Sequence, residues 1–176
     1  MKKLLFVVPL AALLMSCGKV EEQLPSVSPD LSSVKMNYEN CGMSRGAGDT
    51  TEPIAVSLDI EGSESKYVFE IGPHCYAHNT YDEFLLNSEG YIKSKSTYKV
   101  DRLVIDFVYK NGNVNFEVLD ASENAVTSHE SSVETEFPGD NDYGHVFEYP
   151  INGESWTIRN VANKAALYSI TVYFEL

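Results

Sequence analysis

Basic residues are scarce in this sequence. Its 176 residues include 13 Lys and Arg against 26 Asp and Glu, which gives a net charge of −13 at pH 7. Nucleic-acid binding draws its affinity from clustered Lys and Arg, and the sequence contains no such cluster. The acidic balance also opposes adsorption to anionic lipid. The composition therefore argues against a nucleic-acid-binding protein and against a membrane contact that depends on charge.

The sequence has no apolar run long enough to span a membrane. Its main apolar stretch covers residues 4–14, whereas a membrane-spanning helix needs about 20 apolar residues. Lys2 and Lys3 precede this stretch, and the small residue Ser16 follows it, directly before Cys17. A basic start, a short apolar stretch and a small final residue are typical of a cleaved signal peptide. We predict that residues 1–16 form this signal peptide.

The run Leu14-Met15-Ser16-Cys17 resembles the lipobox of bacterial lipoproteins. The resemblance implies that the Cys17 thiol receives a diacylglycerol and that Cys17 becomes the mature N-terminus. Two or three acyl chains together hold a protein firmly at a membrane, whereas one chain holds it only marginally. The alternative is an ordinary secretory leader in which Cys17 has no role.

Residues 17–50 are predicted to form the lipidated N-terminus and a flexible tether. The first part of this segment contains Pro25, Pro29 and several serines, and it lacks a sustained apolar period. Lys19 followed by Glu21-Glu22 resembles the signal that directs lipoproteins of the Bacteroidota to the cell surface. The alternative is an ordinary polar spacer that faces the periplasm.

Cysteine is rare, and only Cys41 and Cys75 remain besides Cys17. The envelope compartment that the leader indicates permits disulfides. A bridge between the two would close a loop of about 35 residues and add roughly 3 to 4 kcal/mol of stability on the chain-entropy model. We expect this bridge, and the alternative is two buried thiols.

Residues 51–176 lack any sustained helical period and instead alternate apolar and polar side chains with period two. Ile54, Val56, Leu58 and Ile60 alternate with polar neighbours, and residues 67–71 form a second such run after a Gly62-Ser63 turn. About eight to ten short strands with regularly spaced turns favour two packed sheets. We therefore predict an all-β domain, an antiparallel two-sheet β-sandwich of the jelly-roll kind.

Two Asn-Gly pairs, Asn111-Gly112 and Asn152-Gly153, each lie between two strand-like segments. These segments are residues 103–109, 114–119, 149–151 and 156–161. Asn-Gly tolerates the left-handed backbone conformation that tight hairpin turns require. The sequence thus predicts two β-hairpins at these positions.

The C-terminal part of the sequence is similar to jelly-roll domains of Bacteroidota lipoproteins, which resemble galactose-binding-like and carbohydrate-binding modules. The similarity rests on residues 156–160 and 168–173, and on residues 100–105 and 115–118 in the middle of the chain. It implies a fold and a location in the cell envelope. Fold similarity of this kind does not transfer an activity.

Catalytic motifs are absent. The sequence has neither a Gly-x-Ser-x-Gly elbow nor a His-Glu-x-x-His motif, and 26 acidic residues make chance carboxylate pairs unavoidable. His74, Cys75 and His78 are spaced like zinc ligands, but a structural zinc takes four ligands and no second Cys/His cluster completes the set. We expect a protein that is not an enzyme and has no cofactor beyond, at most, a structural calcium.

The acidic segment 138–144 is the best candidate for that calcium site. Asp140 and Asp142 alternate with other residues between two glycines, and calcium takes six to eight oxygen ligands from carboxylates and carbonyls. The alternative is a solvated turn.

The segment around residues 74–84 has the composition of a sugar-binding rim. Tyr76, His78, Asn79 and Tyr81 combine aromatic faces with hydrogen-bonding groups, which is how proteins hold the apolar faces and hydroxyls of sugars. The single Trp156 is a further candidate, with packing in the core or at an edge as its alternative.

The sequence taken together predicts a lipid-anchored outer-membrane protein, exposed at the cell surface, that binds a glycan without chemistry of its own. The alternative function is a structural or adhesion subunit whose partner is a protein at the outer membrane. An unpaired edge strand would favour that alternative, because sandwiches commonly pair by strand addition.

Overall fold

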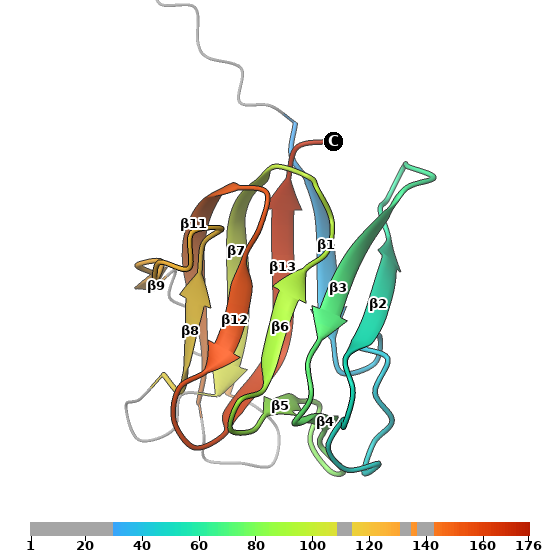
Figure 1. Ribbon diagram of the computed structural model, residues 1–176, viewed down its shortest axis with the longest axis vertical. Coiled ribbons are helices and arrows are strands. Elements are labelled where there is room, and N and C mark those ends of the chain that lie inside the picture. Colours follow the sequence, from blue (N-terminus) through green and yellow to red (C-terminus); the bar gives the residue numbers. More distant parts are fainter. Residues whose placement is uncertain (1–29, 109–113, 131–134, 137–142) are drawn as a thin grey trace, which may run out of the picture.

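Two antiparallel sheets face each other across one hydrophobic core in the computed structural model of the chain (Figure 1). The structure describes residues 30–108, 114–130, 135–136 and 143–176. Every regular element in these ranges is a strand, as the period-two alternation predicts. The predicted all-β, two-sheet sandwich is therefore confirmed. None of the described segments is a helix long and apolar enough to cross a membrane.

The described residues form thirteen strands, more than the eight to ten expected, because several are only two to four residues long. The strands are β1 Ser32–Asn37, β2 Ile54–Asp59, β3 Lys66–Ile71, β4 Cys75–Ala77, β5 Phe84–Leu86, β6 Tyr91–Ser94, β7 Val100–Val108, β8 Phe116–Leu119, β9 His129–Glu130, β10 Thr135–Glu136, β11 Tyr143–Gly153, β12 Thr157–Asn160 and β13 Ala165–Phe174.

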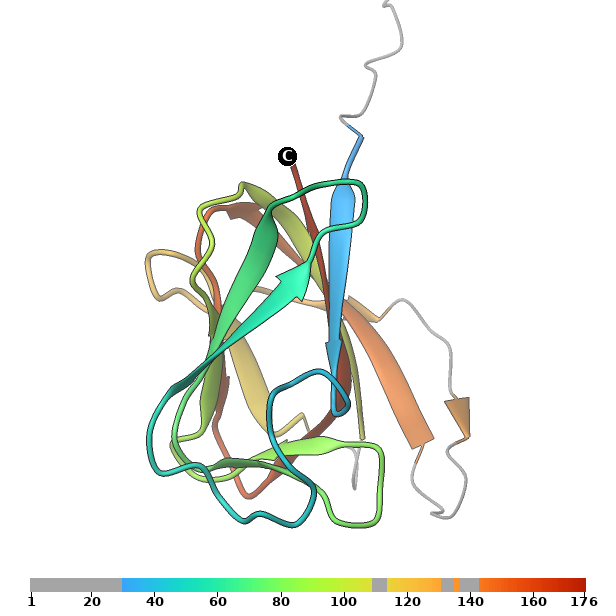
Figure 2. The same cartoon turned by 90° about the vertical axis from the view of Figure 1, so that its right-hand side faces the viewer.

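The first sheet runs in the order β10-β11-β7-β13-β5-β4, with β1 also beside β13 and β9 also beside β11. The second sheet runs β2-β3-β6-β12-β8. Viewed from the side, the two layers separate, with β1 in the same layer as the C-terminal strand (Figure 2). The start of β1 and the C-terminus lie at one end of the sandwich, and β4 and β5 lie at the other (Figure 1).

The core forms between the inward faces of both sheets. In the first sheet, Leu103 and Ile105 on β7 lie directly opposite Val172 and Ile170 on β13, and all four are fully buried. Burying apolar surface in this way stabilises a fold by about 25 cal/mol per Å². The inward faces of β7 and β13 thus lie side by side at the centre of the first sheet.

The turn between β2 and β3 is the one predicted near Gly62-Ser63. Ile54 pairs with Ile71 and Asp59 with Lys66 in an antiparallel register, and Gly62 has a φ of 75°. This left-handed conformation carries no steric cost for glycine. The predicted turn is confirmed, and the two strands that it joins form a hairpin.

The two hairpins predicted at Asn-Gly pairs are wrong. β7 and β8, which flank Asn111-Gly112, belong to different sheets, and so do β11 and β12, which flank Asn152-Gly153. Asn152 does adopt a left-handed φ of 51°, so the bend is present, but it carries the chain across to the other layer. A sharp bend of this kind does not determine whether the next strand pairs with the preceding strand or crosses to the opposite sheet. In the crossing that forms here, Tyr149 before the bend and Trp156 after it are both buried in the core.

The predicted tether of residues 17–50 needs correction over its second part. β1 pairs along its whole length with β13, and its Val34 and Met36 are 5% and 0% exposed. The folded body thus begins by Ser32 rather than at residue 51. The apolar alternation in this strand is only two residues long, too short to stand out beside the Ser- and Pro-rich residues before it. Residues 1–29, including Cys17, lie outside the described part of the chain.

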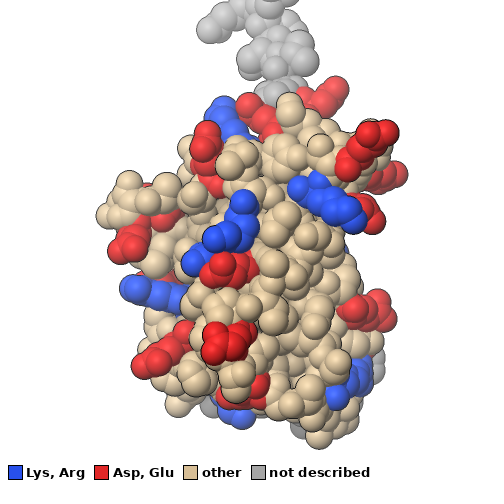
Figure 3. Space-filling view, turned by 45° about the vertical axis from the view of Figure 1, so that its right-hand side comes forward, with Lys and Arg blue, Asp and Glu red and all other residues tan. Residues whose placement is uncertain are grey.

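Several charges on the outer surface form ion pairs, and the two signs are not separated into patches on the face that Figure 3 shows. Acidic and basic groups are interspersed over a largely uncharged face (Figure 3). On the second sheet, the Lys93 ammonium lies 2.8 Å from one Glu70 oxygen and Lys95 lies 3.3 Å from the other. The hydrogen bond from Lys93, with help from Tyr91 and Lys95, lowers the pKa of Glu70 to about 2.

Asp106 on β7 is an exception to this pairing. Its Oδ1 is buried and has no hydrogen-bond partner among the described residues. Burial raises the pKa of the Asp106 carboxyl to about 6, and the charge of Lys35 offsets this only in part. A buried carboxylate without a partner is costly because it has lost its hydration.

We predict that Asp106→Asn stabilises the protein at neutral pH. The folded state binds the Asp106 proton more tightly than the unfolded chain does, so ionisation costs stability as the pH rises from about 4 to about 6. Because the group is partly exposed and screened, we expect a gain of about 1 kcal/mol in the free energy of unfolding at pH 7 and none below pH 4. Urea melts at both pH values measure this gain.

Asp59→Asn is the matched control, because Asp59 is exposed and paired with Lys66. It should change stability little. A gain for Asp106→Asn that is equal at pH 4 and pH 7, or no gain at either, would contradict the prediction.

Candidate functional site

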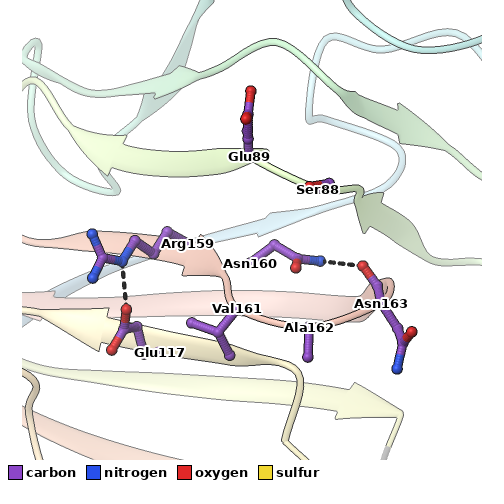
Figure 4. Close-up of a pocket in the computed structure, with 8 residues that line it drawn as sticks. All are labelled: Ser88, Glu89, Glu117, Arg159, Asn160, Val161, Ala162 and Asn163. Atoms are coloured by element: carbon purple, nitrogen blue, oxygen red, sulfur yellow. Dashed lines mark hydrogen bonds and ion pairs between the residues drawn. The ribbon is translucent and has the colours of Figure 1, made fainter.

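An open pocket of about 450 Å³ is lined by residues of two loops and two strands. The two loops lie at the end of the sandwich opposite the start of β1 and the C-terminus (Figure 1). Loop 161–164, between β12 and β13, forms one side with the end of β12 and part of β8, and loop 87–90, between β5 and β6, forms the other (Figure 4). The lining residues are Ser88, Glu89, Glu117, Arg159, Asn160, Val161, Ala162 and Asn163.

Asn160 joins the two sides of the pocket. Its Nδ2 donates to the carbonyl of Leu86 at 2.6 Å and to the carbonyl of Asn163 at 2.9 Å, and its backbone N–H donates to Gly90 at 3.0 Å. One amide side chain thus satisfies carbonyls of both loops. The position at the end of β12 makes this possible, because the strand places Asn160 between the loops.

Arg159 and Glu117 form the charged part of the lining. They lie directly opposite each other on β12 and β8, and Arg159 Nε donates to Glu117 Oε1 (Figure 4). Both side chains retain exposed surface, 54% for Arg159 and 28% for Glu117. The pair therefore offers guanidinium donors and carboxylate acceptors to a ligand within one rigid cross-strand unit.

Loop 161–164 is fixed at both ends by Asn115. The Val161 N–H donates to the Asn115 carbonyl at 2.9 Å, and Asn115 Nδ2 donates to the Lys164 carbonyl at 3.0 Å. Asn163 takes a left-handed φ of 50° to complete the turn. These contacts hold the loop in place without a regular element of its own.

A second group of polar side chains adjoins the pocket. Asn87, next to Ser88, donates to both carboxylate oxygens of Asp49 at 3.0 and 2.8 Å. Lys164, next to Asn163, donates to the Tyr76 hydroxyl at 3.0 Å and lies 5.4 Å from the centre of its ring. The hydrogen bond with Tyr76 raises the pKa of Lys164. Tyr76, a predicted glycan-binding residue, is thus bonded to loop 161–164 but does not itself line the pocket.

The other predicted rim residues are in the loop between β4 and β5, outside the pocket lining. His78 Nδ1 accepts the backbone N–H groups of Thr80 and Tyr81 at 3.2 and 3.1 Å. The rings of His78 and Tyr81 stack at 4.8 Å, and Asn79 is exposed. His78 therefore shapes the turn, and the structure does not bring these three residues together with Tyr76 into one cavity.

The prediction that Trp156 contacts a ligand is wrong. Trp156 is 1% exposed, its Nε1 donates to the Tyr67 hydroxyl at 3.1 Å, and its ring packs against Phe69 at 5.9 Å. Trp156 instead packs in the core, which was the alternative. A large aromatic ring whose N–H donates to a buried partner stabilises a core well.

The predicted disulfide between Cys41 and Cys75 is not formed. Both thiols are free and buried, and Cys41 Sγ donates to the Tyr38 carbonyl at 3.2 Å. Burial raises the pKa of Cys75 to about 12 and also raises that of Cys41. A thiol in this environment acts as a small apolar side chain, as the alternative states.

The metal-site predictions have different outcomes. Asp140 and Asp142 lie outside the described residues. Within the described ranges, no cluster of three or more His, Cys, Asp or Glu could hold a metal ion. In the segment with zinc-like spacing, His74 is exposed whereas Cys75 is buried.

Sequence reasoning missed most of the pocket. Arg159 and Asn160 stand in a segment whose pattern indicates only a strand, and Asn163 looks like an ordinary turn residue. The opposite side comes from residues 87–90, about 70 positions earlier in the chain. No spacing rule links such segments, so only the pairing of β12 with β6 reveals that they meet.

No protein-family model matches this chain. No curated protein matches it either. Among solved structures, the chain is similar to the K2 cleaved adhesin domain of Lys-gingipain (Kgp), with 14% sequence identity and a TM-score of 0.31. The alignment covers 80% of this chain and 88% of that domain. At this TM-score and identity the likeness gives no information about function.

We predict that Asn160→Ala loosens the pocket and lowers stability. The change leaves the carbonyls of Leu86 and Asn163 without their amide donor. The bond to Leu86 is partly buried, and its loss costs about 1 to 3 kcal/mol, whereas water can replace the donor at the exposed Asn163 carbonyl. Urea melts and hydrogen exchange of residues 86–91 and 160–164 measure the effect. Asn79→Ala, an exposed amide in another loop, is the control. Equal stability and exchange in both variants would contradict the role of Asn160.

Proposed function

We propose that this protein is a lipid-anchored binding protein of the cell envelope that holds a glycan in the Arg159–Glu117 pocket and performs no chemistry on it. The observation that carries the proposal is the lining itself, in which a guanidinium, two carboxylates and two side-chain amides surround an open cavity of about 450 Å³. Ligand pockets for small molecules range from about 300 to 1,000 Å³.

The lining groups suit sugar hydroxyls. A hydroxyl donates one hydrogen bond and accepts others, so it is best held by neighbouring donors and acceptors. Arg159 supplies donors and Glu117 supplies acceptors at one point, and Asn163 carries both on its side-chain amide. The exposed part of the Tyr76 ring, beside Lys164, adds an apolar face at the margin.

The position of the pocket agrees with presentation to the outside. β1 begins at the end of the sandwich opposite loops 87–90 and 161–164, which contribute to the pocket lining (Figure 1). If Cys17 carries the lipid, 14 residues separate it from Ser32, a span of at most about 50 Å when extended. An anchor at that end leaves the pocket at the far end of the domain from its attachment point, where the lipid anchor does not block it. We propose the outer membrane as the location, with the surface-export resemblance of Lys19 and Glu21-Glu22 favouring its outer face.

A second candidate function is adhesion to a protein partner, and the edge of the second sheet favours it. Among the described strands, β2 pairs only with β3, and Ala55 and Ser57 on its outward side are small and exposed. The opposite edge is partly covered, because Val126 donates to the Val118 carbonyl on β8. An open edge is a template for an added strand.

We predict that binding of a glycan depends on Arg159. The test uses the purified full chain in detergent, screened by thermal shift against a panel of polysaccharides and oligosaccharides. A ligand at 100 times its dissociation constant should stabilise the fold by about 2.7 kcal/mol. Arg159→Gln should weaken binding of any positive compound by about 10- to 100-fold, because a charged hydrogen-bond donor is lost.

Arg102→Gln is the matched control. Arg102 is also a strand arginine paired with carboxylates, those of Asp101 and Glu148, but it lies in the first sheet. It should leave the dissociation constant unchanged. If no panel member shifts the melting temperature, or if both variants bind equally well, the pocket is not a glycan site and the β2 edge becomes the next target for crosslinking on cells.

A further inference from the structure

We infer that the pocket selects sugars that carry an N-acetyl group, such as N-acetylhexosamines. This inference rests on the proposed function, because it names the class of glycan that the same pocket would take. Three features of the lining lead to it, namely an exposed apolar surface, a fixed loop and the balance of charge.

Val161 supplies the apolar surface. It is 51% exposed, and only Leu176 at the C-terminus is another exposed large hydrophobic residue in the described part of the chain. Ala162 follows it in the lining. An apolar side chain in a polar pocket favours a ligand that brings a methyl group to it, since burying that methyl removes apolar surface of both partners from water. Unmodified hexoses carry no methyl group, whereas an acetamido group does.

The Val161 surface is held in a fixed place. The Val161 N–H is bonded to the Asn115 carbonyl at 2.9 Å, and Asn160 on its other side is bonded to both Leu86 and Asn163. The backbone therefore has little freedom to turn the valine inward when a ligand is absent. A preformed contact surface avoids the ordering cost that a flexible loop would add on binding.

The charge of the lining favours a neutral ligand. Glu89, Glu117 and Arg159 are its charged residues, so the lining carries one net negative charge, and the whole chain carries −13. Uronic acids, sulfated sugars and phosphates would be repelled. An acetamido group is neutral, and it has one N–H donor and one carbonyl acceptor. The Glu117 carboxylate can accept the former, and Arg159, which lies opposite it on β12, can donate to the latter (Figure 4).

The experiment compares two trisaccharides that differ only in this group. Isothermal titration of the full chain measures the dissociation constants of the β-1,4-linked trimer of N-acetylglucosamine and the β-1,4-linked trimer of glucose. We expect the acetylated trimer to bind at least tenfold more tightly. Val161→Thr, which replaces one methyl by a hydroxyl of similar size, should reduce that ratio several-fold and leave the melting temperature close to that of the unmodified chain.

Val68→Thr is the matched control. Val68 lies on the outward face of β3, away from the pocket lining, and its substitution should leave the ratio unchanged. Equal binding of the two trimers, or a ratio that Val161→Thr does not alter, would overturn the N-acetyl inference and leave glycan binding in place. Binding of neither trimer, together with binding of another panel glycan, would also overturn it. If no glycan of the panel binds, the proposed function is overturned as well.

Discussion

The pairing of β13 with β7 is the constraint on which the rest of the structure depends. β13 contacts β7 on one side, and on the other it contacts β1 along one half and β5 along the other half. The half beside β5 begins at Ala165, directly after loop 161–164. Because β13 is fixed by its inward apolar residues, the loop that precedes it has a fixed starting point. The position of the pocket therefore depends on the packing of β13 in the core.

Side-chain amides take the place of regular structure at this end of the sandwich. Asn160, Asn115 and Asn87 each bond to a segment distant in sequence. A loop that runs over the surface would otherwise present its carbonyls and N–H groups to water and remain adaptable. These amides form hydrogen bonds with some of those backbone groups, so the loops are held in one conformation. The charged and apolar side chains of the pocket stay exposed for contact with a ligand.

Strands with a sustained alternation, such as β2 and β3, could be predicted from the sequence because burial on one face imposes period two. The strand β1 could not, because only Val34 and Met36 carry its inward pattern. The layer to which a strand belongs could not, because Asn152-Gly153 produces the same left-handed bend whether the chain returns as a hairpin or crosses to the other sheet. The composition of segment 74–84 indicated a sugar-binding rim, yet none of its residues lines the pocket, and Tyr76 contacts only Lys164 of loop 161–164. Composition does not show that the His78 ring is used by its own turn.

The arrangement separates stability from recognition. Trp156, the largest aromatic side chain, is buried directly before β12, whereas Arg159, near the end of this strand, is exposed at the pocket. One face of β12 therefore secures the strand against the core, and the other presents the ion pair with Glu117. A change of the pocket-lining charges removes no core contact, so the lining can vary in specificity while the sandwich that positions it stays intact. Because the residues that determine the fold and the residues that line the pocket are different, a sequence pattern that resembles a known fold says little about the ligand.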